Sequence, residues 1–202
     1  TAAGVCAVNT PEAPTESTAE FTLALLLAVA RQVARADRGM RAGACGGTPD
    51  LIGFDLAGKT LGLVGCGRIG ARVAELASAF RMTVQAFDPR PDALPAGVTR
   101  VRDFATLLAT SDVVSLHVPL LSSTRKLINA ATLAQMKPGA VLLNAARGPI
   151  VDEAALHAAL LSGRLAGAGL DVWDPEPPAA GNPLLALPNV VATPHLAALT
   201  RE

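Results

Sequence analysis

The sequence has few of the features that mark a secreted, membrane-bound or nucleic-acid-binding protein. Its three cysteines, Cys6, Cys45 and Cys66, are odd in number and widely spaced. This pattern favours reduced thiols over a disulfide framework or a zinc site. The formal charge is zero and like charges do not cluster, which argues against a nucleic acid or an anionic membrane as partner. The apolar run 21–30 is too short to span a bilayer. With no leader pattern at the start, we expect a cytoplasmic protein without a bound metal.

The sequence does contain enough apolar residues for a buried sheet. Half of its 202 residues are hydrophobic and 17% are charged, which is typical of a globular domain. A chain of this length buries roughly 70% of its unfolded surface. No internal repeat or low-complexity tail is present, so we expect the chain to fold around its own core.

Short apolar runs alternate with helical patterns through most of the chain. The runs lack strict polar alternation, which indicates parallel strands buried on both faces. We therefore predict an α/β fold with a doubly wound parallel sheet of the Rossmann type. The expected strands are 60–64, 83–87, 113–118, 140–144, 167–172 and 189–192, and the expected helices are 15–41, 68–80, 104–110, 131–136 and 153–161. Prolines at 175, 177 and 178 predict a loop over 175–183.

The first of these helices is expected to run without a break from residue 15 to residue 41. Hydroxyl side chains at 15, 17 and 18 can cap its start, and arginines at 31, 35, 38 and 41 suit its carboxyl end. A Gly-rich connection, 43–58, follows it. Residues 1–42 are then a lead-in segment and connecting helix, and residues 43–202 form the dinucleotide-binding domain.

A glycine-rich turn between the first strand and the next helix predicts a dinucleotide site. Gly65, Gly67 and Gly70 have the G-x-G-x-x-G spacing, which is weak by itself but gains weight from a strand before it and a helix after it. Gly65 allows a tight turn, and Gly67 lets backbone amides approach a pyrophosphate. Gly70 permits close packing of helix against strand, and the helix N-terminus adds positive potential.

An acidic residue predicts which dinucleotide binds. The second strand ends at Asp88, eighteen residues after Gly70. A carboxylate at this point accepts hydrogen bonds from the adenosine ribose hydroxyls and repels a 2′-phosphate. We therefore expect NAD in preference to NADP, although Arg90 is close enough in sequence to weaken that preference.

Polar residues follow three later strands, at the edge where ligands bind in open α/β sheets. A nicotinamide enzyme that reduces a carbonyl needs a proton donor, a group that holds that donor in place, and a cation for an anionic substrate. His195 suits the first task because an imidazole ordinarily exchanges its proton near neutral pH. Glu176 suits the second task as a carboxylate for the far imidazole nitrogen. Arg147 suits the third, since its guanidinium offers two parallel donors to a carboxylate.

Five segments, in the same order, resemble the signatures of the D-isomer-specific 2-hydroxy acid dehydrogenases. They are 62–70, 117–121, 144–153, 169–178 and 193–196, and the resemblance covers nearly the whole chain. It implies NAD-dependent transfer of a hydride between the cofactor and a 2-oxo or D-2-hydroxy acid. It also implies that Arg147, Glu176 and His195 are the catalytic residues.

The same resemblance assigns further cofactor contacts. It implies that Arg68 and Ile69 contact the pyrophosphate and that Asp171 holds the nicotinamide carboxamide. Pro119 and Ala145 are expected to lie along the cofactor. His117 is added by its position after a strand, where it can face the cofactor.

Members of this family normally have two lobes, and this sequence resembles only the cofactor lobe. We therefore expect a truncated chain with the substrate lobe largely absent, and a homodimer, because the family usually pairs through this domain. Three hypotheses stay open: an NAD-dependent oxidoreductase domain, a catalytically silent NAD-binding module with a sensing or corepressor-like role, and a nonproductive fragment of a dehydrogenase. The sequence does not identify the hydroxy acid, so glyoxylate or hydroxypyruvate reduction and 3-phosphoglycerate oxidation both remain open.

Overall fold

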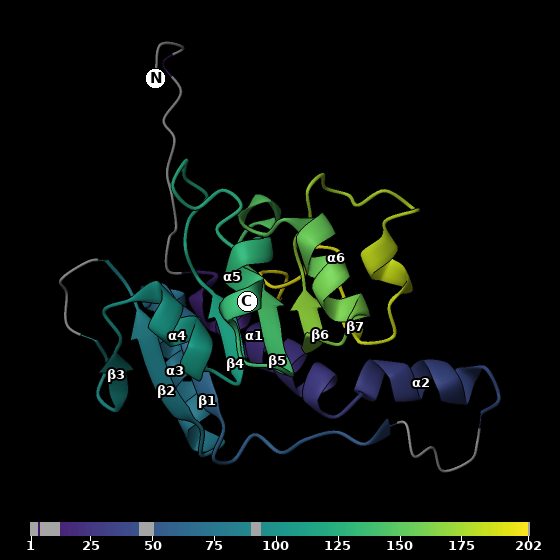
Figure 1. The fold of residues 1–202 in the computed structure, drawn as a ribbon, viewed down its shortest axis with the longest axis horizontal. Coiled ribbons are helices and arrows are strands. Elements are labelled where there is room, and N and C mark those ends of the chain that lie inside the picture. Colours follow the sequence, from purple (N-terminus) through teal and green to yellow (C-terminus); the bar gives the residue numbers. More distant parts are fainter. Residues whose placement is uncertain (1–3, 5–12, 45–50, 90–93, 202) are drawn as a thin grey trace.

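A computed structural model of the chain describes residue 4 and residues 13–44, 51–89 and 94–201. In these residues seven strands form one parallel sheet in the order β3-β2-β1-β4-β5-β6-β7 (Figure 1). The strands are β1 (Thr60–Val64), β2 (Thr83–Phe87), β3 (Val98–Arg100), β4 (Val113–Leu116), β5 (Ala140–Asn144), β6 (Leu165–Leu170) and β7 (Val190–Ala192). The strand order reverses between β1 and β4, which is the switch point where doubly wound sheets bind ligands. The predicted fold class is confirmed.

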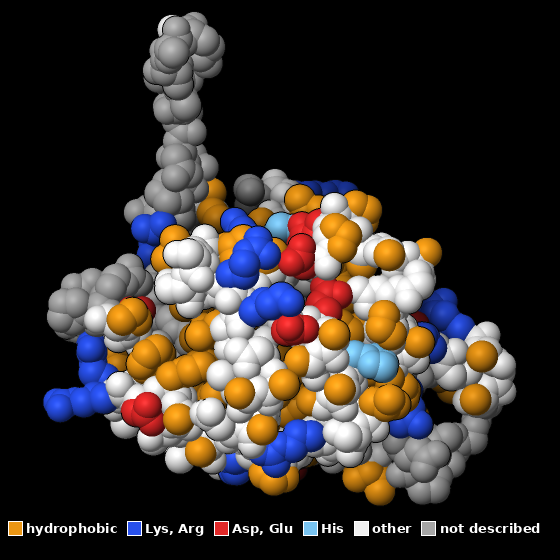
Figure 2. All heavy atoms as spheres, turned by 45° about the horizontal axis from the view of Figure 1, so that its top comes forward, with side chains coloured by type: hydrophobic (Ala, Val, Ile, Leu, Met, Phe, Trp, Pro, Cys, Tyr) orange, Lys and Arg blue, Asp and Glu red, His pale blue; other side chains and the backbone are white. Residues whose placement is uncertain are grey.

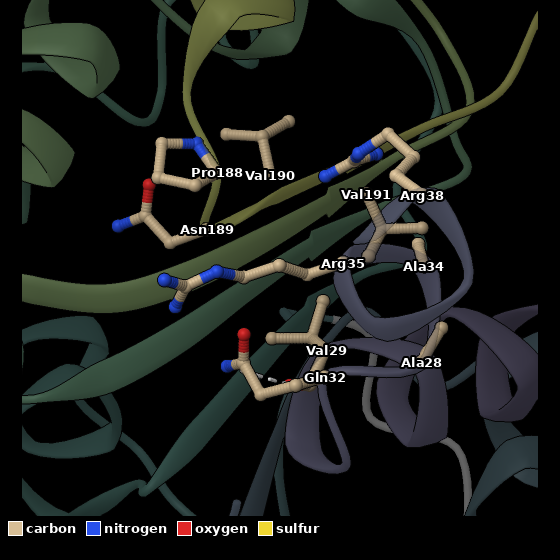
Figure 3. A pocket seen from close by; sticks show the side chains of 10 residues that line it. All are labelled: Ala28, Val29, Gln32, Ala34, Arg35, Arg38, Pro188, Asn189, Val190 and Val191. Carbon is tan, nitrogen blue, oxygen red and sulfur yellow. Dashed lines mark hydrogen bonds between the residues drawn. The ribbon is translucent and has the colours of Figure 1, made fainter. Parts of the chain in front are cut away.

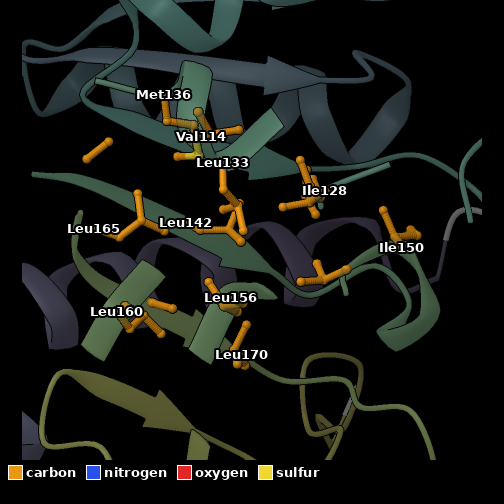
Figure 4. Close-up of a cluster of buried hydrophobic side chains, with 14 of the residues drawn as sticks. Val114, Ile128, Leu133, Met136, Leu142, Ile150, Leu156, Leu160, Leu165 and Leu170 are labelled. Atoms are coloured by element: carbon orange, nitrogen blue, oxygen red, sulfur yellow. The ribbon is translucent and has the colours of Figure 1, made fainter. Parts of the chain in front are cut away.

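Helices cover both faces of the sheet (Figure 1). The helices α1 (Thr15–Ala30) and α3 (Arg68–Ala79) lie on one face, and α4 (Phe104–Thr110), α5 (Ala130–Gln135) and α6 (Glu153–Leu161) lie on the other. The buried side chains accordingly form two clusters, one on each face. In β5, for example, Leu142 lies between the buried side chains of α5 and those of α6 (Figure 4), whereas Leu143 belongs to the cluster on the face of α1. This two-sided burial explains why the strands read as continuous apolar runs.

The predicted long helix over 15–41 is wrong in one respect, because it breaks into two. The helix α1 ends at Ala30, Gln32 adopts a left-handed backbone with φ +55°, and α2 (Val33–Arg41) continues after a bend of 64°. The carbonyl of Ala30 accepts a hydrogen bond from the amide of Phe54 at 2.9 Å. That long-range bond takes the acceptor that a continuing helix would need, so the helix ends there.

The start of α1 also differs from the sequence prediction. The N-cap residue is Pro14, and no side-chain hydroxyl caps the helix. The hydroxyl of Ser17 instead donates to the carbonyl of Pro14 at 3.4 Å. The hydroxyls at 15, 17 and 18 are therefore inside the helix or at its first residue and not at its cap.

The helix α2 extends away from the sheet (Figure 1) and has no buried residue. Val33 is 54% exposed and Met40 is 59% exposed. Where α2 approaches β7, Gln32, Arg35 and Val191 line a void of about 10 Å³ (Figure 3), which has room for about one water molecule. The helix thus has an apolar surface that the described part of the chain does not cover.

Several element boundaries are shorter or longer than predicted. β4 stops at Leu116, two residues before the predicted end, and β6 covers 165–170 where 167–172 is expected. Sequence patterning misses β3, since two of its three residues are exposed and it lies at the sheet edge. The expected loop over 175–183 is confirmed up to Asn182, after which a 3₁₀ helix, η3 (Pro183–Ala186), begins.

No single helix in the described part of the chain is long and apolar enough to cross a membrane. The pair α1 and α2 reaches that length and composition only when both are counted across their bend. Residues of α1 such as Leu25 and Leu26 are buried against the sheet and α3.

Candidate cofactor and catalytic site

A cleft of about 810 Å³ lies at the carboxyl ends of β1, β4 and β5. Seven of the residues predicted from the sequence line it: Arg68, Ile69, His117, Pro119, Ala145, Arg147 and His195. They come from four separate segments, which the parallel sheet brings to one edge. The volume lies in the range of small-molecule and cofactor sites.

Two residues of the glycine-rich turn, Arg68 and Ile69, line this cleft, whereas its three glycines shape the turn behind them. Gly65 has φ +88°, and a Cβ on it would lie 2.6 Å from the carbonyl oxygen of His117. A Cβ on Gly70 would lie 2.6 Å from the carbonyl oxygen of Gly65. Gly67 is the N-cap of α3 and has no side chain to occupy the first amides of that helix. Side chains at 65 and 70 would therefore collide with the backbone. The close-packed turn, called the glycine cradle below, presents the N-terminus of α3 to the cleft, which fits a pyrophosphate.

Asp88 lies directly after β2 and reaches the same turn. Its Oδ2 accepts a hydrogen bond from the amide of Cys66 at 2.8 Å. Cys66 is the cysteine that lies in the described part of the chain, whereas Cys6 and Cys45 lie outside the described residues. This geometry places the Asp88 carboxylate beside the cradle, where the ribose of a dinucleotide would lie. Arg90, expected to weaken the NAD preference, also lies outside the described residues.

His117 lines the cleft directly beside the glycine-rich turn. Its amide donates to the carbonyl of Val64 at 2.8 Å, and its Nε2 lies 2.9 Å from the hydroxyl of Ser115. Burial lowers the pKa of His117 to about 4. The imidazole is therefore uncharged at neutral pH, and it forms a neutral polar wall rather than a cationic one.

Glu176 and His195 form a direct pair. The Nδ1 of His195 lies 3.0 Å from the Oε2 of Glu176, and the Oε1 of Glu176 accepts from the amide of Trp173 at 2.9 Å. Desolvation raises the pKa of Glu176, but the Trp173 amide, the hydrogen bond and charge of His195 and the charge of Arg147 outweigh it, so the net pKa is lowered. The carboxylate is thus charged at neutral pH and holds one nitrogen of the imidazole.

Arg147 enters the cleft from the turn that follows β5. Its Nη1 donates to the carbonyl of Ala146 at 2.6 Å. Asn144, which is 1% exposed, fixes this turn, because its Nδ2 donates to the carbonyl of Arg147 and its Oδ1 accepts from the amide of Ala146. Sequence reasoning missed this role of Asn144, although an amide side chain at the end of a buried strand is a recognisable turn signal.

Asp171 has a structural role that the sequence did not predict. The residue is fully buried, and its carboxylate accepts from the hydroxyl of Thr193 at 2.6 Å and from the amides of Leu196 and Ala197 at 2.8 and 2.9 Å. Its carbonyl accepts from the amide of His195 at 2.7 Å. Asp171 therefore holds the backbone around His195, whose φ is +60°. Its contact with a nicotinamide carboxamide stays a prediction.

The cleft also contains residues that sequence reasoning did not single out. These are Pro14, Thr18, Val118, Leu120, Ala146, Ala197 and Ala198. Most are neighbours of predicted residues and follow the same strands, so position alone could have found them. Thr18 is different, because α1 brings it to the cleft from a distant part of the sequence and no local pattern signals that contact.

In the described part of the chain, no group of three His, Cys, Asp or Glu side chains is close enough to hold a metal ion. Among the described residues that line the cleft, the charged side chains are the arginines Arg68 and Arg147. Figure 2 shows acidic and basic side chains side by side on the face that the carboxyl ends of the strands approach. Two ion pairs occur among these loops, Lys126 with Asp152 at 3.0 Å and Arg125 with Asp174 at 3.8 Å.

A glycine cradle on one wall and a histidine–carboxylate pair on another define a dinucleotide-binding oxidoreductase domain. Comparison with known protein families gives the particular family. Residues 23–197 match the D-isomer specific 2-hydroxyacid dehydrogenase, NAD binding domain. The chain belongs to this family, whose cofactor is NAD.

Two curated relatives and one solved structure show the extent of the similarity. The chain is 48% identical to a D-3-phosphoglycerate dehydrogenase of Archaeoglobus fulgidus and 46% identical to a hydroxypyruvate reductase of Thermotoga maritima, with 98% of this chain covered in both. A crystal structure of D-lactate dehydrogenase with NAD+ from Lactobacillus jensenii superposes with a TM-score of 0.85 at 36% identity over 95% of this chain. The chain spans 38%, 65% and 62% of these three proteins respectively.

Proposed function

We propose that this chain is the cofactor-binding part of an NAD-dependent enzyme that interconverts a 2-oxo acid and a D-2-hydroxy acid. The observation that supports this most directly is the His195–Glu176 pair at 3.0 Å, since its histidine lines the same cleft as Arg147 and the glycine-rich turn. A cofactor-binding domain without a reaction to catalyse would have no need for this pair. The named relatives are enzymes, and none of them supports the alternative of a silent binding module.

Each residue predicted for the site has a task in this proposal. The amides at the start of α3, with Gly65, Gly67, Arg68, Ile69 and Gly70, would hold the pyrophosphate. Asp88 would bind the adenosine ribose and disfavour a 2′-phosphate. The remaining contacts along the cofactor would be those of His117, Pro119, Ala145 and Asp171. When bound, the nicotinamide supplies or accepts the hydride.

The chemistry at the substrate follows from the pair. Because Glu176 holds Nδ1 of His195, the other nitrogen, Nε2, is the one that gives a proton to the carbonyl oxygen during reduction and takes it back during oxidation. The charged Glu176 stabilises the protonated imidazole before that transfer. The Arg147 guanidinium orients the substrate carboxylate by paired hydrogen bonds.

Our proposal for the substrate goes as far as the class of 2-oxo acids and does not name one acid. The two curated relatives are named for different acids, 3-phosphoglycerate and hydroxypyruvate. The chain covers only part of either relative. We propose that the residues that select between these acids lie in the part of the relatives that this chain does not cover. The division into a lead-in segment, 1–42, and a cofactor domain, 43–202, is part of the same proposal, as is a cytoplasmic location.

We also propose that the chain forms a homodimer through α2. This helix has no buried residue, and Val33 and Met40 present apolar side chains on it. Sedimentation equilibrium at several concentrations should show a dimer for the native chain and a monomer for Val33→Asp with Met40→Asp. A native chain that stays monomeric at every concentration would exclude the dimer.

Turnover tests the catalytic proposal. NADH oxidation is followed at neutral pH with glyoxylate, hydroxypyruvate, pyruvate and 3-phosphohydroxypyruvate in turn. His195→Ala should lower the rate with the preferred acid by at least about 10²-fold, the usual contribution of a general acid. His157→Ala is the matched control, since His157 lies on α6 and is not among the residues that line the cleft. Equal rates for the two variants would reject His195 as the proton donor.

A further inference from the structure

We propose that Glu153 is a positioning residue that sets Glu176, and through it His195, by tying both ends of the catalytic loop to the start of α6. The catalytic loop is defined here as residues 174–182. This inference rests on the proposed function, because Glu176 and His195 are its catalytic pair. It concerns a residue that is not among those that line the cleft.

The two oxygens of Glu153 reach opposite ends of the catalytic loop. Oε1 accepts a hydrogen bond from the amide of Asp174 at 2.9 Å, and Oε2 accepts from the Nδ2 of Asn182 at 2.6 Å. Asp174 and Asn182 are the first and last residues of the loop, and Glu176 lies between them. The single carboxylate of Glu153 thus holds both ends of the loop.

Besides Glu153, the catalytic loop is held by the two bonds of Glu176 and by the bond from the amide of Asn182 to the carbonyl of Ala179 at 2.9 Å. Most of its residues are exposed, including Asp174, Glu176, Ala179 and Ala180, so apolar burial contributes little to its position. Its prolines at 175, 177 and 178 have no amide hydrogen to donate. The pair of Arg125 and Asp174 spans 3.8 Å between exposed side chains, and such pairs are weak. The two bonds to Glu153 are thus the contacts that join the first and last residues of this exposed loop to α6.

Glu153 can restrain the loop because its own helix is packed against the core. It is the first residue of α6, and Leu156 and Leu160 of that helix are buried in the core. Asp152 caps the helix by accepting from the amide of Ala155. A negative charge in the first turn of a helix is favourable in its own right. That effect explains an acidic residue at 153, but it does not explain why both oxygens bind a different segment.

The restraint passes from Glu153 to the imidazole in short steps. Asp174, fixed by Glu153, lies between Trp173 and the catalytic Glu176. Glu176 then folds back onto the amide of Trp173 with one oxygen and holds Nδ1 of His195 with the other. A shift of the loop moves the Glu176 carboxylate, and the histidine loses the acceptor that keeps its proton on Nδ1.

A swap of hydrogen-bond partners tests this inference. Both partners of Glu153 are hydrogen-bond donors. In Glu153→Gln the new NH₂ group is also a donor and faces either Nδ2 of Asn182 or the amide of Asp174, so one of the two hydrogen bonds is lost. In Asn182→Asp two carboxylates face each other, while the bond from the Leu184 amide that Asn182 accepts at 3.0 Å is kept. The double variant, Glu153→Gln with Asn182→Asp, restores the pairing with donor and acceptor exchanged. Asp152→Asn is the control, because it removes a charge from the same helix start without touching the loop.

The main readout is the tautomer of His195, measured by long-range ¹H–¹⁵N correlation, with its signals assigned from His195→Ala. We expect Nδ1–H in the native chain and the control, a mixture of tautomers in each single variant, and Nδ1–H again in the double variant. NADH affinity should stay within about twofold in all of them. If the chain shows turnover, kcat should fall about tenfold in each single variant and recover in the double variant. This loss is smaller than the roughly 10²-fold loss that a misplacement of 1 Å causes.

Two results would overturn the inference. One is a Glu153→Gln variant whose tautomer populations match those of Asp152→Asn. The other is a folded double variant that keeps the mixed tautomers of the single variants. If Glu153→Gln does not fold, Asn182→Asp tests the same contact from the loop side. The tautomer of His195 is measured without substrate. A chain without turnover would therefore count against the proposed function, and the tautomer would still test the role of Glu153.

Discussion

Gly148 and Trp173 are in backbone contact so close that no side chain fits between them. A Cβ on Gly148 would lie 1.9 Å from the carbonyl oxygen of Trp173 and 2.0 Å from its carbonyl carbon. Gly148 directly follows Arg147, and the Trp173 amide donates to Glu176. The contact therefore sets the distance between the turn that carries Arg147 and the segment that carries Glu176.

Gly148→Ala should consequently disturb both stability and site. One of the two backbone segments must move, and such overpacking costs about 1–3 kcal/mol. We expect the free energy of unfolding in urea to fall by that amount and the Trp173 emission to shift, since the indole is 3% exposed in the native chain. Gly181→Ala is the control, because nothing lies within 4 Å of a Cβ there. Equal stability of both variants would show that the contact is looser than described.

Glu176→Gln should weaken the catalytic pair without changing its size. The native carboxylate accepts from both the Trp173 amide and Nδ1 of His195, whereas an amide side chain has one acceptor oxygen for two donors. We expect a loss of turnover of at least about 10²-fold, with NADH affinity unchanged. An active variant at native rate would show that His195 needs no carboxylate.

The same substitution should alter the acid limb of the stability curve. The pKa of Glu176 is lowered from 4.5, so the folded state binds the proton more weakly than the unfolded state does. Its contribution is therefore present above about pH 4.5 and is lost as the pH falls through the lowered pKa. Urea unfolding of Glu176→Gln between pH 5 and 3 should show a shallower loss of stability than the native chain. Superimposable curves would contradict the lowered pKa.

His117 should contribute a second pH dependence at higher pH. Burial lowers the pKa of His117 from 6.5 to about 4, so between these values the unfolded state binds a proton that the folded state does not. Stability should then fall as the pH decreases from 6.5 towards 4, by at most about 3 kcal/mol at about 1.4 kcal/mol for each pH unit. His117→Gln should lose this slope, as measured by urea unfolding at pH 7, 5.5 and 4.5. His157→Gln is the control that should keep it, and a slope unchanged in His117→Gln would place the titrating group elsewhere.

Asp88→Ala should narrow the preference for NADH over NADPH. The carboxylate lies beside the glycine turn, bonded to the Cys66 amide at 2.8 Å, where it would face the ribose 2′-position. Removing it takes away both a ribose acceptor and a repulsion of the 2′-phosphate. Affinities for the two cofactors, measured by calorimetry, should therefore converge through weaker NADH and stronger NADPH binding. An unchanged ratio would remove Asp88 from the role proposed for it.

The features that the sequence predicted well are those fixed by local chemistry. Gly65 and Gly70 were found because a turn with a left-handed backbone and a close helix leaves room for nothing larger, and apolar runs marked the buried strands. The break after Ala30 was missed because its cause is the amide of Phe54, which belongs to a segment that returns to the helix. Glu153 was interpreted only as a helix start, since its partner Asn182 is 29 residues away. Tertiary contacts of this kind leave no periodic trace in the sequence.

NADH titration tests most directly whether this cleft binds NAD next to the pair of Glu176 and His195. Trp173 is the single tryptophan in the chain, and its indole nitrogen donates to the carbonyl of Thr193, two residues before His195. We predict saturable quenching of its emission by energy transfer to the nicotinamide, with binding heat of the same midpoint in calorimetry. Unchanged Trp173 emission together with no binding heat would show that NADH does not bind in this cleft.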